Sequence, residues 1–176
     1  MDRSKWVLLG AASAAVVLVA CMAGCLVMLK TIAPRAGAAR TVFESKSALP
    51  GDADEATITP AFVGAFERAD LEVPQPPIAF DADVAAVYGD GRSLVCFYHK
   101  ASPGANPDDL WNELKRAVGR ATVNSISWNA GDVRSIRGTV RDTKESIWAW
   151  ESRGSMFVVT CPEIETATDF VSKYPY

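Results

Sequence analysis

The sequence predicts an α+β protein in which a single N-terminal transmembrane helix precedes a small antiparallel-sheet domain. Three observations support this prediction. Residues 6–29 form a run of 24 residues without a charged side chain. Six short apolar segments separated by turn residues occupy much of 81–176, which is typical of antiparallel strands. Two further segments there have the apolar spacing of amphipathic helices.

The predicted order of elements in 81–176 is β-β-α-β-β-β-β-α. Asp90 and Gly91 form a strong hairpin signal between the first two strands. Asn106 can cap the first helix, Pro107 suits its first position and Gly119 is expected to end it. We expect both helices to cover one face of the sheet. This order resembles the PsbP-type sandwich of small extracytoplasmic domains, a resemblance that implies a fold and carries no function.

The apolar run at 6–29 is long enough for a helix that stays in the membrane. A cleaved secretory signal has a shorter apolar region, of about 7–15 residues. A lipoprotein leader is the third alternative, because the residues ending at Cys21 and at Cys25 resemble the bacterial lipobox. Apolar residues follow Cys25, where a lipobox is normally followed by polar ones. We therefore favour the retained helix and keep lipidation of Cys21 or Cys25 as the alternative.

The expected placement is a single pass through the cell membrane, with the C-terminal domain on the extracytoplasmic (periplasmic) side. Gly10 and Ala14 are candidate helix-packing residues, because small residues four apart allow another helix to approach closely. Cys96 and Cys161 each lie in a strand-like segment and are a candidate disulfide pair. A disulfide would agree with an oxidising compartment, whereas two buried free thiols are the alternative.

The chain is expected to divide into a short tail (1–5), the transmembrane helix (6–29), a tether (30–80) and an extracytoplasmic α+β domain (81–176). Within the tether, Phe62, Phe66 and Ala69 have the spacing of one helix face and predict a short helix over 60–70. Three prolines in 72–80 predict an extended, Pro-rich strap, because proline lacks the amide hydrogen that regular structure needs.

Few side chains in the sequence are suited to catalysis. His99 is the one histidine, and no phosphate-binding loop, zinc-ligand spacing or nucleophile motif occurs. We therefore expect no enzymatic activity, no metal ion and no cofactor. A net charge of −3 gives no general attraction to nucleic acid.

A basic and aromatic group is the candidate interaction site. Arginine and tryptophan are enriched at the hot spots of protein interfaces, and basic side chains can also contact lipid headgroups. The alternative is core packing for the tryptophans and ordinary solvation for the arginines. The candidate residues are Arg134, Arg137, Arg141, Trp148 and Trp150.

The expected function combines these features. We expect a non-catalytic, membrane-anchored accessory or scaffolding subunit of a larger membrane protein complex, with other membrane-protein subunits as its partners. The alternative is a bacterial lipoprotein-like domain that binds a small ligand or lipid between its sheet and helices.

Overall fold

The computed structural model describes residues 42–43, 46–89, 93–102 and 104–176, which belong to a unit that runs from Arg40 to Tyr176. The transmembrane helix predicted over 6–29 lies outside these residues, and so do four site candidates. Those candidates are Gly10, Ala14, Cys21 and Cys25. In the part of the chain that the structure describes, no helix is both long enough and apolar enough to cross a membrane.

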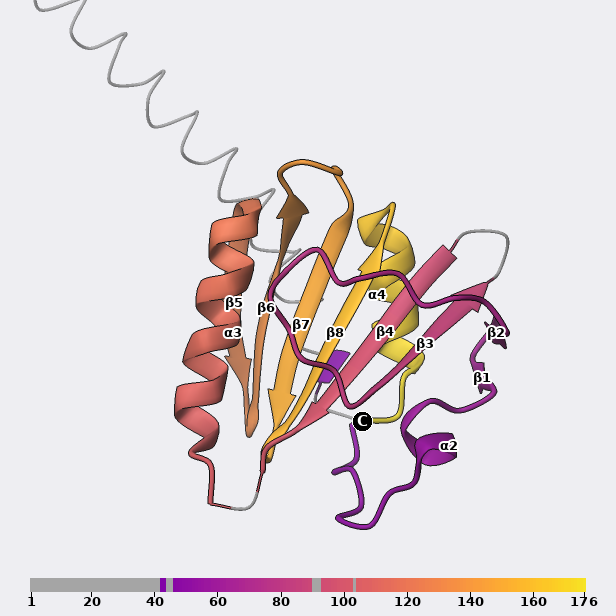
Figure 1. Cartoon of the computed structure of the whole chain (residues 1–176), viewed down its shortest axis with the longest axis horizontal. Coiled ribbons are helices and arrows are strands. Elements are labelled where there is room, and N and C mark those ends of the chain that lie inside the picture. The colour runs from indigo at the N-terminus through magenta and orange to yellow at the C-terminus, as the bar shows by residue number, and fades with distance from the viewer. Residues whose placement is uncertain (1–41, 44–45, 90–92, 103) are drawn as a thin grey trace, which may run out of the picture. The chain divides into compact units, whose positions relative to one another are not determined.

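An open antiparallel sheet of eight strands forms the body of this unit, in the order β1-β2-β3-β4-β8-β7-β6-β5 (Figure 1). The hairpin β3–β4 joins the meander β5–β8 because β4 pairs with β8. The order β-β-α-β-β-β-β-α that was predicted for 81–176 is confirmed. The strands are β1 (Phe62–Val63), β2 (Phe66–Ala69), β3 (Val84–Gly89), β4 (Ser93–Lys100), β5 (Thr122–Ala130), β6 (Val133–Val140), β7 (Ser146–Ser152) and β8 (Ser155–Cys161).

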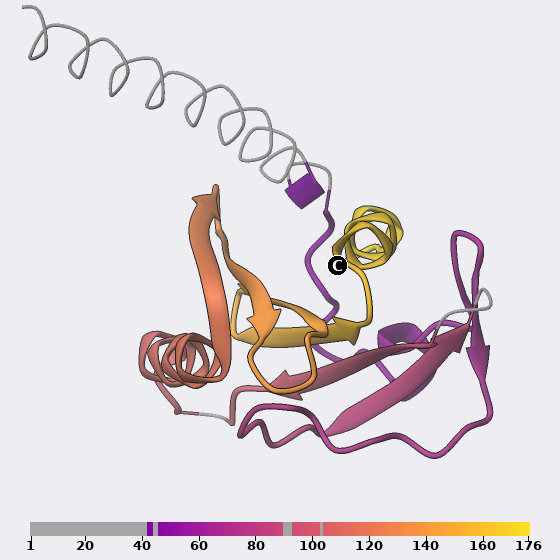
Figure 2. The same cartoon turned by 90° about the horizontal axis from the view of Figure 1, so that it is seen from above.

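The two longer helices, α3 (Pro107–Ala121) and α4 (Ile164–Lys173), lie on opposite faces of the sheet (Figure 2). In β7, Ile147 and Ala149 belong to the core that α3 covers. Trp150, on the other face of β7, contacts the ring of Tyr174 next to α4. The prediction that both helices cover one face is therefore wrong. The physical reason is that β7 and β8 are apolar on both sides, so each face needs its own cover.

Helix α3 forms for the local reasons that its sequence indicates. The Asn106 side chain accepts a hydrogen bond from the Asp108 N–H at 3.0 Å, and Pro107 occupies the first position. The helix continues past Gly119, the expected end, to Ala121. Its buried stripe, which packs on the sheet, consists of Trp111, Leu114, Ala117 and Val118.

Gly138 of β6 lies where Thr122 approaches the sheet, and a Cβ there would lie 2.9 Å from the Thr122 Cβ and Oγ1 atoms. Thr122 is held, since its Oγ1 donates to the Val118 carbonyl at 2.8 Å. We therefore expect Gly138→Ala to lower the free energy of unfolding by about 1–3 kcal/mol, measured by urea unfolding. Gly119→Ala, whose Cβ meets nothing within 4 Å, is the control and should raise stability. Equal effects of the two changes would contradict this account.

The segment predicted as a helix over 60–70 is instead a hairpin of β1 and β2, so that prediction is wrong. Gly64, with φ of +61°, makes the turn, and the neighbouring side chains Val63 and Phe66 are buried. Strand β2 pairs with β3, so its backbone N–H and C=O groups find partners in the sheet. A helix as short as this segment would leave many of these groups without an internal partner. The helix that does form, α2 (Glu55–Ile58), lies just before it and is capped by Asp54.

The Pro-rich strap (72–80) contains neither helix nor strand, bends at 77–79 and runs across the α3 side of the sheet (Figure 1). Ile78 anchors it, because this side chain is buried in the core that includes Leu114 of α3 and Val158 of β8. Phe80 packs against the same core and is only partly buried. The strap and α3 therefore share one face of the sheet, and residues of both line a cleft.

Candidate ligand cleft and interaction surface

A cleft of about 460 Å³ lies between the strap and α3, and we name it the His99 cleft. His99 of β4 and Met156 of β8 are direct cross-strand partners and line it from the sheet. Because side chains alternate along strands, both point to the face that carries α3. The strap contributes Ala79 and Phe80, Asp81 follows it directly, and one side of α3 contributes Leu110, Glu113 and Leu114.

His99 is held by contacts on two sides. Its Nδ1 lies 3.3 Å from Asp83 Oδ2, and the Phe80 ring stands nearly perpendicular to it, with ring centroids 6.1 Å apart. The contact with Asp83 is not a hydrogen bond, and the Nδ1 atom is buried without one. The same Asp83 oxygen accepts the Lys100 N–H at 2.7 Å, which fixes the carboxylate. The imidazole is therefore positioned mainly by packing, as one wall of the cleft.

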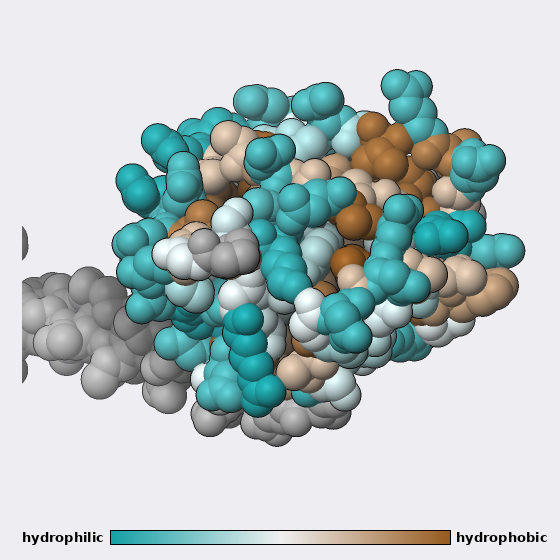
Figure 3. Space-filling model, turned by 60° about the horizontal axis from the view of Figure 1, so that its bottom comes forward, coloured by the Kyte–Doolittle hydropathy of each residue, from teal (hydrophilic) through white to brown (hydrophobic). Residues whose placement is uncertain are grey.

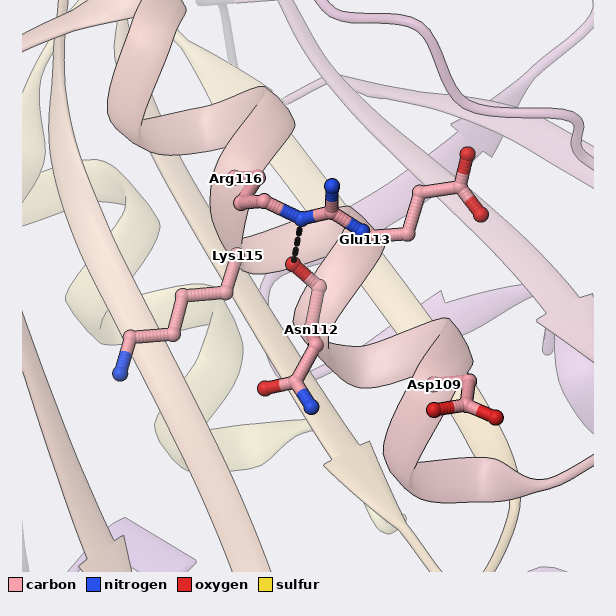
Figure 4. A pocket seen from close by; sticks show the side chains of 5 residues that line it. All are labelled: Asp109, Asn112, Glu113, Lys115 and Arg116. Atoms are coloured by element: carbon pink, nitrogen blue, oxygen red, sulfur yellow. Dashed lines mark hydrogen bonds between the residues drawn. The ribbon is translucent and has the colours of Figure 1, made fainter.

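Two carboxylates line the cleft. Asp81, which directly follows the strap, and Glu113 of α3 supply them, and none of the described lining residues is lysine or arginine. Figure 4 shows the Glu113 side chain leaving α3 on the side opposite Lys115. The remaining lining is mostly apolar, so the His99 cleft combines an apolar interior with carboxylates.

A larger hollow of about 690 Å³ lies on the outer side of α3 and is an ordinary exposed helix surface (Figure 4). Arg116 Nε donates to the Asn112 carbonyl at 3.2 Å, one turn earlier on the same helix. The side chains of Lys115 and Glu113 diverge from one another. Among the described residues, the side chains that line this hollow all belong to α3, and we assign it no function.

The structure brings two of the predicted interaction residues, Arg137 and Trp148, into contact and separates the others. Arg134 lies on the α3 side, where its Nε donates to the buried Glu151 carboxylate at 2.8 Å and its Nη1 to Asp108. Trp148 and Trp150 are fully buried and pack inside the core. The remaining candidates are Arg137, on the α4 side of β6, and Arg141, which is exposed just after β6.

On the α4 side of the sheet, α4 contacts β7 and β8, and β5 and β6 lie beyond β7 toward the β5 edge. We call this area the outer-strand face and define it by Ile126, Trp128, Arg137 and Thr139. The Arg137 guanidinium lies 5.5 Å from the Trp128 ring centre and 5.4 Å from that of Trp148, in cation–π geometry. Ile126, the cross-strand partner of Arg137, is 47% exposed. Sequence reasoning missed Ile126 and Trp128, although both alternate along β5.

Further exposed apolar side chains lie near the other edge of the sheet. These are Phe62 of β1 together with Leu71 and Val73, which follow β2, and we name them the β1–β2 edge patch. Figure 3 shows apolar surface gathered toward its upper right, and β1 and β2 lie on the right side of Figure 1. The patch was not predicted, because its residues were assigned to the tether.

Lys46 lies in the segment that was predicted as a tether, yet it is largely buried on the α4 side. Its Nζ donates to the carbonyls of Val171 at 2.6 Å and Tyr174 at 2.5 Å, at the C-terminal end of α4. The rings of Phe43, Trp150 and Tyr174 surround it at 5.6–5.8 Å. Burial lowers the pKa of the Lys46 ammonium to about 8.

Cys96 and Cys161 lie on the α4 side of neighbouring strands, and both are free, buried thiols in the structure. Cys96 is paired with Val159, so Cys161 is two residues further along β8. Burial raises the pKa of the Cys96 thiol to about 12 and that of Cys161 to about 11. The candidate disulfide is therefore not formed in this structure. Across the described residues, no group of three or more possible metal ligands occurs.

No protein-family model and no curated protein sequence matches the chain. Among solved structures, the chain is similar to the crystal structure of a GTP binding regulator from Thermotoga maritima, with a TM-score of 0.50 and 14% sequence identity. The match covers 72% of this chain and 90% of that one. At this identity the similarity concerns the α+β fold and assigns no activity.

Proposed function

We propose that the chain is a non-catalytic accessory subunit of a membrane protein complex, anchored by residues 6–29 and docked through the outer-strand face. The composition of that face carries the proposal. Trp128, Arg137 and Ile126 are adjacent there, and β5 contains no charged residue along its length. Interface cores are depleted in charge and enriched in tryptophan and arginine. The partner surface that fits is therefore an apolar segment of another membrane-protein subunit.

Co-purification tests this proposal. The full chain is extracted from its membranes in mild detergent, and the proteins that accompany it are identified and quantified. Ile126→Lys should reduce the accompanying subunit about tenfold, because it places a charge in the interface. Leu71→Lys, the same kind of change in the β1–β2 edge patch, should leave the yield unchanged. A chain that migrates alone, or a partner that survives Ile126→Lys, would overturn the proposal.

A second candidate function is ligand binding by the extracytoplasmic domain, and the His99 cleft favours it. Small-molecule sites are concave, mostly apolar hollows of about 300–1,000 Å³ with a few polar groups, and this cleft has that character. The GTP binding named for the similar structure is not part of this candidate, because the cleft carries carboxylates and a triphosphate needs cations.

A further inference from the structure

The ligand chemistry of the His99 cleft follows from what lines it. Leu114 and Met156 close the bottom of the cleft but are only 4% and 2% exposed, so they offer little surface of their own. Leu110 of α3 and Phe80 of the strap are partly buried and extend the apolar lining toward solvent. An apolar ligand body can therefore replace water against these side chains, which is favourable in proportion to the area covered.

The charges around the cleft select the head group of the ligand. Asp81 and Glu113 come from different parts of the chain, since Asp81 directly follows the strap and Glu113 belongs to α3, and both line the cleft. With two carboxylates and neither lysine nor arginine among the described lining residues, the cleft disfavours an anionic head group. A cationic head group gains from both carboxylates and from the aromatic face of Phe80.

We propose that the His99 cleft binds a small amphipathic cation, an organic ammonium with an aromatic or short aliphatic body. This inference rests on the second candidate function and adds the ligand class to it. The apolar body lies against Leu110 and Phe80, the ammonium lies near Asp81 and Glu113, and His99 forms the wall against which the body packs.

The one histidine of the chain makes a direct test available. The untagged full chain in detergent is titrated with 2-phenylethylammonium at constant pH, and the ring signals of His99 are followed by NMR. Two probes with the same ring, 2-phenylethanol and 3-phenylpropionate, replace the cation by a neutral and an anionic group. We expect saturable shifts of the His99 signals with the ammonium, weaker binding of the alcohol and none of the carboxylate.

Charge-removing variants complete the test. Glu113→Gln and Asp81→Asn should each weaken binding of the ammonium about threefold, as expected for partly exposed charge pairs, and leave binding of the alcohol unchanged. Glu165→Gln, on the exposed side of α4, is the matched control and should change nothing. Equal binding of all three probes would overturn the ligand class while ligand binding stands. Absence of any shift would overturn both.

Discussion

Trp150→Ala is expected to lower the free energy of unfolding by about 3–5 kcal/mol, the largest effect of any single change considered. Trp150 is fully buried, and its ring stacks on that of Phe157 with centroids 4.9 Å apart and an interplanar angle of 13°. It also contacts Phe43 and Tyr174, which come from opposite ends of the described chain. Removal of the indole leaves a cavity that three separate segments would have to fill.

Urea unfolding of the chain in detergent measures this effect. Domains of this size have a free energy of unfolding of about 5–15 kcal/mol, so the loss is a large share of the total. Ile126→Ala, at an exposed position of the outer-strand face, is the control and should cost less than about 1 kcal/mol. A cost for Trp150→Ala as small as that of the control would show that the aromatic cluster does not hold the fold.

Lys46→Met is expected to remove a pH-dependent part of the stability. The pKa of Lys46 falls from 10.5 in the unfolded chain to about 8 in the fold, because burial disfavours the charged ammonium. Between these pH values the unfolded state binds more protons, so the free energy of unfolding contributed by this group rises with pH. The full rise is on the order of 3 kcal/mol. The variant lacks it, so wild type should gain stability relative to Lys46→Met from pH 7.5 to 10.5.

The measurement is a comparison of the two proteins by urea unfolding at several pH values. The difference between them is required, because burial raises the pKa of Cys96, Cys161, Tyr88 and Tyr174. Those groups ionise more readily in the unfolded chain and therefore lower stability as pH rises in both proteins. The contribution of Cys96 is the one that Lys46 also affects, since the lysine charge lowers the pKa of that thiol. If the difference between wild type and Lys46→Met stays constant across this range, the ammonium is not desolvated in the fold.

The elements that could be predicted from the sequence are those with local causes. The cap at Asn106, Pro107 after it and the apolar stripe that follows define α3 without reference to any other element. The faces covered by the helices could not be predicted in this way. The alternation in β7 places tryptophan on one side and Ile147 and Ala149 on the other, and all of them are buried. Such a strand is compatible with cover on either face or on both.

The candidate sites were only partly predictable for a related reason. Arg137 was identified from its residue type, but its neighbour Trp128 contacts it across two strands, which the sequence does not reveal. Arg134 has the same chemistry but lies three residues earlier on β6, so its side chain is on the opposite face, where it pairs with Glu151. The His99 cleft depends on a strap, a helix and two strands that meet only in the folded state.

The contacts of Lys46 carry a mechanical consequence. The first described residues are fastened to the last ones, since Lys46 binds the carbonyls of Val171 and Tyr174, and the Ser47 N–H donates to Pro175 at 3.0 Å. A pull on the chain ahead of Phe43 is therefore transmitted first to the C-terminal helix and to the aromatic side chains beneath it. The force reaches the edges of the sheet only after the hydrogen bonds of Lys46 and Ser47 have broken.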